Sequence, residues 1–155
     1  TGGASVGDHD LVRDALQERG MALDFWRIAM RPGKPLLFGR LGATRVLGLP
    51  GNPVSSLVCA LLFLRPLVEA LLGLPQADPT VGATLGGPVR ANDARQDYIR
   101  ARLSIADDGG RVATPIERQD SAMLSAFHRA GCLIVRPPHA EAEEVGARCR
   151  VVILP

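Results

Sequence analysis

Apolar positions in the first half of the chain follow a helical spacing and then gather into short runs. Apolar residues recur at helical spacing from about Asp8 to Arg19, and Gly20 is a residue suited to end a helix. The short runs predict strands at residues 23–30, 36–41 and 46–49. A helix followed by strands predicts an α/β organisation here.

A second helix is predicted after these strands. Asn52 is suited to the N-cap position and Pro53 to the first helical position, and the apolar stretch that follows predicts a helix to about Leu72. The longest apolar run within it, 57–64, is much shorter than the roughly 20 residues that span a bilayer. A membrane span is therefore not expected.

From residue 76 onward, proline and glycine separate short segments, which favours β structure. Ile99, Ala101, Leu103 and Ile105 alternate with Arg100, Arg102 and Ser104, a pattern typical of a half-buried strand. The turn residues at 107–110 predict a hairpin with a return strand over 111–116. A short helix over 121–129 and strands at 132–135 and 148–154 complete the expected elements.

Composition narrows the class of protein without identifying a function. Apolar residues make up 46% and charged residues 22%, as in a globular protein, and a net charge of +2 does not indicate nucleic-acid binding. No basic segment followed by an apolar stretch opens the chain, so a secretory signal is not expected. The three cysteines are an odd number without C-x-x-C spacing, which predicts reduced, mostly buried thiols. Lys34 is the only lysine among 18 lysine and arginine residues.

Three loops have the chemistry to hold an anion, and the first is the glycine-rich segment 2–10. Glycines let the backbone approach a ligand closely, and the N–H groups at a helix start favour oxyanions. Asp8 and Asp10 could hold a divalent cation, or Asp8 could cap the helix with Asp10 in its first turn. His9 is expected to face solvent. The candidate anion-binding residues of this loop are Gly2, Gly3, Ser5 and Gly7.

The second loop, 31–35, carries two cations three residues apart. Arg31 could bind an oxyanion through two N–H groups of its planar guanidinium, and Lys34 could bind it as a compact positive charge. Alternatively, the segment could be an ordinary surface turn. The third loop, 48–55, joins a strand to a helix and leaves free N–H groups at the helix start. Its residues could bind an anion or only cap the helix: Pro50, Gly51, Asn52, Pro53 and Ser55. In an open α/β sheet, two such strand-to-helix turns meet at the carboxyl edge of the strands.

Taken in order, the motifs G-G-A-S-V-G-D-H-D, R-P-G-K-P and G-L-P-G-N-P-V-S resemble the molybdopterin molybdenumtransferase family. This family includes bacterial MoeA proteins and the E domain of gephyrin. Further on, residues 94–100 resemble the family's arginine segment, and Gln119-Asp120-Ser121 followed by Leu124 resembles its Gln-x-Ser helix start. The resemblance extends over nearly the whole chain.

The resemblance implies a fold and a reaction. Residues 1–75 are expected to form the second part of a molybdopterin-binding three-layer α/β/α domain, and 76–155 a small all-β, barrel-like C-terminal domain. The implied enzyme hydrolyses adenylated molybdopterin with Mg²⁺, inserts molybdenum from molybdate and releases AMP. It is expected to be a cytoplasmic homodimer that binds small molecules and neither nucleic acid nor membrane. The T-G-D-E segment and the two N-terminal domains of the family are missing, so the chain by itself is expected to be inactive.

Roles follow from the resemblance residue by residue. Asp10 matches the family's functional aspartate and is expected to place the cation or the pterin phosphate. Arg31 and Lys34 match the basic loop near the oxyanion, although the family usually has lysine at position 31. A compact, rotatable ammonium at Lys34 would suit a tetrahedral oxyanion better than a planar fork would. Pro50 and Pro53 match functionally sensitive prolines, and positions that face molybdate are matched by Ser55, Arg95 and Ser121.

Two other functions remain open at this stage. The chain could be a gephyrin-like scaffold that binds a peptide, or a stand-alone molybdopterin-binding domain of the adenylyltransferase type. The predicted β segments after residue 76 argue against the second alternative, because such proteins resemble only the α/β part.

Overall fold

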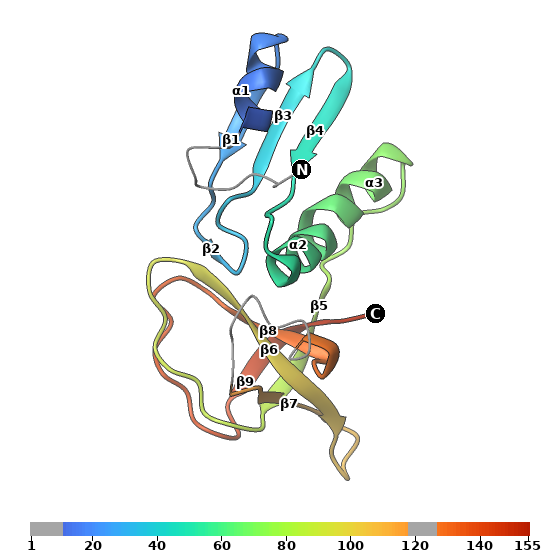
Figure 1. Cartoon of the computed structure of the whole chain (residues 1–155). Helices are drawn as coiled ribbons and strands as arrows, with labels where there is room; N and C mark the ends of the chain where they lie inside the picture. The colour runs from blue at the N-terminus through green and yellow to red at the C-terminus, as the bar shows by residue number, and fades with distance from the viewer. Residues whose placement is uncertain (1–10, 118–126) are drawn as a thin grey trace. The chain divides into compact units, whose positions relative to one another are not determined.

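The computed structural model describes residues 11–117 and 127–155, and the chain divides into two compact units, Thr1–Gln76 and Ala77–Pro155 (Figure 1). Each unit is considered by itself. The division into functional domains at residues 75 and 76, expected from the sequence, stays a prediction. The expected helix over 121–129 lies largely outside the described residues.

The first unit contains helices and a small sheet. Its elements in chain order are α1 (Leu11–Glu18), β1 (Ala22–Trp26), β2 (Met30–Arg31), β3 (Leu37–Leu41), β4 (Thr44–Gly48), α2 (Pro53–Cys59), the π-helical turn η1 (Ala60–Leu64) and α3 (Arg65–Leu71). Gly20 ends α1 as expected: it has a φ of +90°, its N–H bonds Gln17, and the N–H of Met21 bonds Leu16. The glycine therefore closes a Schellman motif.

The sheet of this unit has the antiparallel order β1-β3-β4. The single strand expected over 23–30 is wrong in its extent, because β1 ends at Trp26 and Arg27 has a φ of +70°, which no extended strand tolerates. The convergence expected at a carboxyl edge assumed parallel strands, whereas the described strands are antiparallel. A small core lies between α1 and the sheet, where Leu16 packs against Met21 and Leu37.

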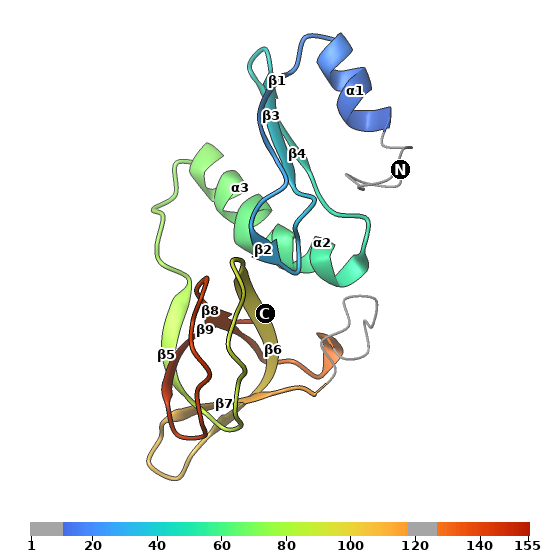
Figure 2. The same ribbon diagram turned by 90° about the vertical axis from the view of Figure 1, so that its left-hand side faces the viewer.

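The helix after β4 is continuous through α2, η1 and α3 (Figures 1 and 2). Pro66 would break an α-helix because it lacks an N–H and its ring meets the carbonyl four residues earlier. The π-helical turn immediately before it accommodates this change, with the N–H of Arg65 bonding the carbonyl of Ala60. Gly73, with a φ of +71°, ends the helix close to the predicted position.

This helix ends close to the predicted Leu72, but it is apolar over a longer stretch than the run 57–64 indicated. Pro53–Leu71 has 19 residues and a mean hydropathy of 1.8, which is enough to cross a membrane by length and composition. The run 57–64 understated the apolar length because apolar residues continue beyond Arg65 and Pro66 in the same helix. A core helix of a soluble protein meets the same measure, so this one helix is weak support for a membrane span.

The second unit is a closed five-stranded barrel. Its strands are β5 (Thr80–Leu85), β6 (Gln96–Ile105), β7 (Arg111–Pro115), β8 (Cys132–Arg136) and β9 (Arg148–Ile153). They follow the order β6-β7-β5-β9-β8, and β6 also pairs with β8, which closes the sheet. Only the β5–β7 pair is parallel among these described pairings. The predicted α/β part followed by a β-barrel is confirmed.

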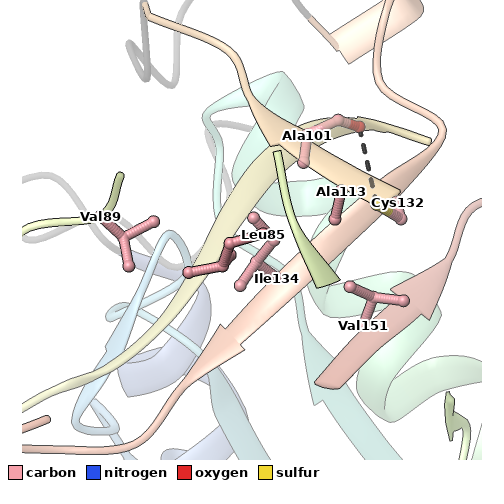
Figure 3. Close-up of a cluster of buried hydrophobic side chains, with 7 residues drawn as sticks. All are labelled: Leu85, Val89, Ala101, Ala113, Cys132, Ile134 and Val151. Carbon is pink, nitrogen blue, oxygen red and sulfur yellow. Dashed lines mark hydrogen bonds between the residues drawn. The ribbon is translucent and has the colours of Figure 1, made fainter. Parts of the chain in front are cut away.

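The barrel interior is filled by small and branched side chains (Figure 3): Leu85, Val89, Ala101, Ala113, Cys132, Ile134 and Val151. The thiol of Cys132 donates to the carbonyl of Ala101 across 3.8 Å. The alternation predicted for β6 is correct for Ala101, but Arg100, expected to face solvent, is only 2% exposed, and Ile105, expected inside, is 65% exposed. Arg100 lies opposite Leu133 in the middle of the β6–β8 pairing, whereas Ile105 lies at the hairpin end of β6.

Candidate functional site

The basic loop between β1 and β3 is held by backbone hydrogen bonds across its base. The N–H of Arg27 donates to the carbonyl of Leu36 at 3.1 Å, and the N–H of Ile28 donates to that of Lys34 at 2.9 Å. The peptide bond between Arg31 and Pro32 is cis. These contacts make residues 27–36 an ordered loop rather than a free surface turn.

Gly33 fixes this loop against α2. Its φ of +117° is a conformation that glycine alone adopts readily. A Cβ atom at this position would lie 2.4 Å from the Cε of Met30 and 2.6 Å from the Sγ of Cys59. The thiol of Cys59 is also placed 3.9 Å from the Gly33 carbonyl, which accepts its hydrogen bond. The loop backbone therefore packs directly on the helix.

The start of α2 has the predicted cap. Asn52 is extended, with φ −71° and ψ 126°, and its Oδ1 accepts from the N–H of Ser55 at 3.3 Å. The buried hydroxyl of Ser55 lies 3.5 Å from the same oxygen. Pro53 occupies the first turn, as expected. The side chain of Asn52, the last residue before the helix, thus bonds the loop to the first turn of α2.

The second predicted loop packs on α2, the helix that starts in the third predicted loop. Ser55 and Cys59 are four residues apart on this helix, so they lie on the same face, and both are buried. Because Gly33 contacts Cys59, the last residue of α2, the basic loop lies against the C-terminal end of this helix. Arg31 and Lys34, in the same loop, are both exposed. The arrangement is suited to binding a small oxyanion.

The Cys59 thiol is buried and poorly suited to ionise. Burial raises the pKa of Cys59 from 9.0 to about 12 and that of Cys132 from 9.0 to about 11. All three cysteines are free, with Cys149 only half-buried, as the sequence predicted. Cys59 therefore supports the loop by packing, and its raised pKa makes the thiolate form unfavourable.

We expect the free energy of unfolding to fall as the pH rises above 9. The unfolded chain loses its thiol protons near the ordinary pKa of 9.0, while the native state keeps them until the raised values are reached. Stability from these thiols is therefore complete below pH 9 and is lost between 9 and about 12. Urea denaturation of the chain and of Cys59→Ala, each at about pH 8 and about pH 10, measures this difference. An equal pH-dependent decrease in both proteins would contradict the assignment to Cys59.

The other predicted site residues are not among those that form the basic loop and the start of α2. The residues of the first loop and Ser121 lie outside the described ranges: Gly2, Gly3, Ser5, Gly7, Asp8, His9, Asp10 and Ser121. Arg95 is in the second unit, where its guanidinium pairs with Asp93 at 2.6 Å. Within 11–117 and 127–155, His, Cys, Asp and Glu form no group of three that could hold a metal ion. The site assignments therefore stay predictions.

Two features of the site were missed from the sequence. Cys59 was taken for an ordinary buried thiol, although it supports the basic loop. The only tryptophan, Trp26, was not considered, although Arg13 and Arg27 both stack on its ring. No spacing signal joins Gly33 to Cys59, because they are 26 residues apart; the Trp-Arg pair at 26 and 27 was visible but unremarkable.

Family comparisons agree with both units. Residues 1–70 match the family model described as a probable molybdopterin binding domain, and residues 82–154 match the one described as the MoeA C-terminal region (domain IV). The chain thus consists of an α/β segment that matches a probable molybdopterin binding domain, followed by a barrel that matches the C-terminal region of MoeA proteins. It belongs to the molybdopterin molybdenumtransferase family.

Several relatives carry the same name. The chain is 36% identical over 137 residues to a molybdopterin molybdenumtransferase of Haemophilus influenzae, covering 87% of this chain and 34% of that protein. It is 39% identical over 127 residues to one of Synechococcus elongatus, covering 81% of this chain and 30% of that protein. The chain therefore spans about a third of the length of these relatives.

A solved structure shares the fold. A molybdopterin biosynthesis MoeA protein from Pyrococcus horikosii superposes with a TM-score of 0.76 and 27% identity, over 93% of this chain and 34% of that one. A molybdenum cofactor biosynthesis protein from Pyrococcus furiosus superposes with a TM-score of 0.72 at 23% identity, over 95% of this chain and 55% of that one, and this shows the fold alone.

Proposed function

We propose that the protein carrying this chain works in molybdenum cofactor biosynthesis. In this proposal it takes molybdate and adenylated molybdopterin as substrates, inserts molybdenum and releases AMP. The observation that carries the proposal is the packing of the basic loop, through Gly33, on Cys59 of α2. This packing holds the loop that carries the exposed Lys34 cation against the helix that Asn52 caps.

The described residues have different roles in the proposed binding of an oxyanion. Lys34 supplies a compact positive charge, and in the described part of the chain its ammonium has no carboxylate partner. Arg31 adds a second cation from the same loop. Asn52 and Ser55 order the helix start, and the residues that shape the loop before it are Pro50, Gly51 and Pro53.

Further parts of the proposal rest on the family resemblance. They are a Mg²⁺ requirement met by Asp8 and Asp10, pterin or phosphate contacts from the first loop, and molybdate contacts from Arg95 and Ser121. They also include a cytoplasmic homodimer with small-molecule substrates and no nucleic acid or membrane partner, and domains that divide at residues 75 and 76. The chain by itself is proposed to be inactive. None of the binding steps above depends on the metal ion.

The proposal is tested by molybdate binding to the complete gene product. We expect Lys34→Ala to weaken molybdate binding at least about tenfold, equal to about 1.4 kcal/mol, because a charge-assisted contact is lost. Lys34→Arg should also weaken it, because a planar fork does not replace a rotatable ammonium. Isothermal titration calorimetry measures both, with Arg45→Ala as a control that removes an exposed cation from β4 of the same unit.

The possible results separate the hypotheses. Unchanged affinity in Lys34→Ala would overturn the proposed oxyanion site. Unchanged affinity in Lys34→Arg alone would discard the preference for a compact ammonium while leaving the site in place. An effect of Arg45→Ala as large as that of Lys34→Ala would mean that only net charge matters.

A further inference from the structure

Trp26, at the end of β1, has two arginine side chains over its ring. The Cζ atom of Arg13 lies 4.2 Å from the ring centroid, and the Cζ atom of Arg27 lies 4.0 Å from it. A guanidinium group is attracted to the negative face of an aromatic ring. The half-buried ring of Trp26 thus determines where two positive charges lie.

Arg27 reaches the ring through an unusual backbone conformation. In a regular strand, neighbouring residues send their side chains to opposite faces, so Arg27 would point away from Trp26. Its φ of +70° interrupts the strand, and the residue still donates its N–H to Leu36. Such a conformation is unfavourable for a residue with a Cβ and, where it occurs, often belongs to a functional site.

The two arginines differ in their charge balance. The Nε of Arg13 donates to Oδ1 of Asp14 at 2.8 Å, so its charge is paired. The exposed guanidinium of Arg27 contacts the Trp26 ring and has no carboxylate partner among residues 11–117 and 127–155. A guanidinium that stacks by its face keeps its in-plane N–H donors available, and these donors match the oxygens of a phosphate group.

Arg27 also lies at the base of the basic loop. Its backbone pairs with Leu36, and that of Ile28 pairs with Lys34, so the loop with Arg31 and Lys34 begins where Arg27 stands. All three cations are exposed. The cationic edge of the first unit is therefore larger than the motif at 31–35 indicates.

We infer that Arg27, positioned by Trp26, binds a phosphate group of the substrate, while Lys34 binds the smaller oxyanion. This inference rests on the proposed function, in which the substrate is an adenylated phosphate ester. Arg27 is a binding residue in this scheme, and Trp26 is a positioning residue that holds the guanidinium over its ring.

The test uses AMP, the product of the proposed reaction, as the phosphate probe. In titration calorimetry of the complete gene product, Arg27→Ala should weaken AMP binding about tenfold, equal to about 1.4 kcal/mol. Molybdate binding should stay within about twofold of the parent protein. Arg27→Gly should lose AMP affinity equally, although glycine adopts a positive φ readily and should fold at least as stably.

Arg13→Ala is the matched control, because it removes the other guanidinium from the same ring but one whose charge is already paired. Its AMP affinity should equal that of the parent protein. Equal AMP affinities in the parent, Arg27→Ala and Arg27→Gly proteins would overturn the inference, as would a parent protein that does not bind AMP at millimolar concentration. In either case, molybdate binding that still depends on Lys34 would leave the proposed function standing. Loss of that dependence, with AMP binding still sensitive to Arg27, would overturn only the oxyanion site.

Discussion

Replacing Gly33 with alanine is expected to lower the free energy of unfolding by about 3 kcal/mol, since overpacking and an unfavourable φ act together. The added Cβ would lie 2.4 Å from the Cε of Met30 and 2.6 Å from the Sγ of Cys59. The Met30 methyl group can move, but Cys59 is held in a buried position on α2. The loop must therefore shift away from the helix. Urea denaturation followed by circular dichroism measures the loss.

Gly42 provides a matched control in the β3–β4 turn. It also has a positive φ, +57°, but a Cβ there would meet nothing within 4 Å. Gly42→Ala should cost only about 1 kcal/mol, the price of the left-handed conformation alone. The double variant Gly33→Ala/Cys59→Ala should cost less than the sum of its single changes, because the shorter side chain relieves the overlap. Equal costs for Gly33→Ala and Gly42→Ala would disprove the docking role of Gly33.

Removing the carboxylate of Glu143 is expected to destabilise the barrel by about 3 kcal/mol, because it leaves a buried positive charge without its partner. Arg136 on β8 is only 3% exposed, and its NH1 lies 2.6 Å from Oε2 of Glu143. Its NH2 group donates to the carbonyl of Glu141, and its Nε has no partner among the described residues. The guanidinium therefore depends on Glu143. Thermal denaturation of Glu143→Ala measures the effect.

The reverse change should be milder. In Arg136→Met an apolar side chain of similar length replaces the buried charge, and Glu143, whose side chain is 38% exposed, can be hydrated by solvent. The exposed pair of Arg150 and Asp78 serves as a control, since Arg150→Ala should cost less than about 1 kcal/mol. A Glu143→Ala protein as stable as Arg150→Ala would show that the buried pair contributes no more than a surface pair.

Local features were predicted well because few neighbouring residues determine them. The cap formed by Asn52 and Pro53, the glycine that ends α1 and the hairpin turn at 107–110 all lie close to the predicted positions. Each depends on backbone conformation within about one turn of chain. The order of the three motifs also led to the family, which the matches to both family models support.

Errors arose where distant residues decide the outcome. Arg100 was expected to face solvent from its place in the alternation, yet its side chain is buried. The strand expected over 23–30 ends early because Arg27 turns back over Trp26.

The amino-acid sequence by itself determined the helix ends, the turns, the α/β segment followed by β structure, and the family, since each is encoded in a few adjacent residues or an ordered motif. Only the tertiary structure decided that the basic loop packs on α2 and that Trp26 holds two guanidinium groups. The contact of Gly33 with Cys59 joins residues 26 positions apart. Such a contact depends on the chain's packing as a whole, because no local preference of either residue favours it.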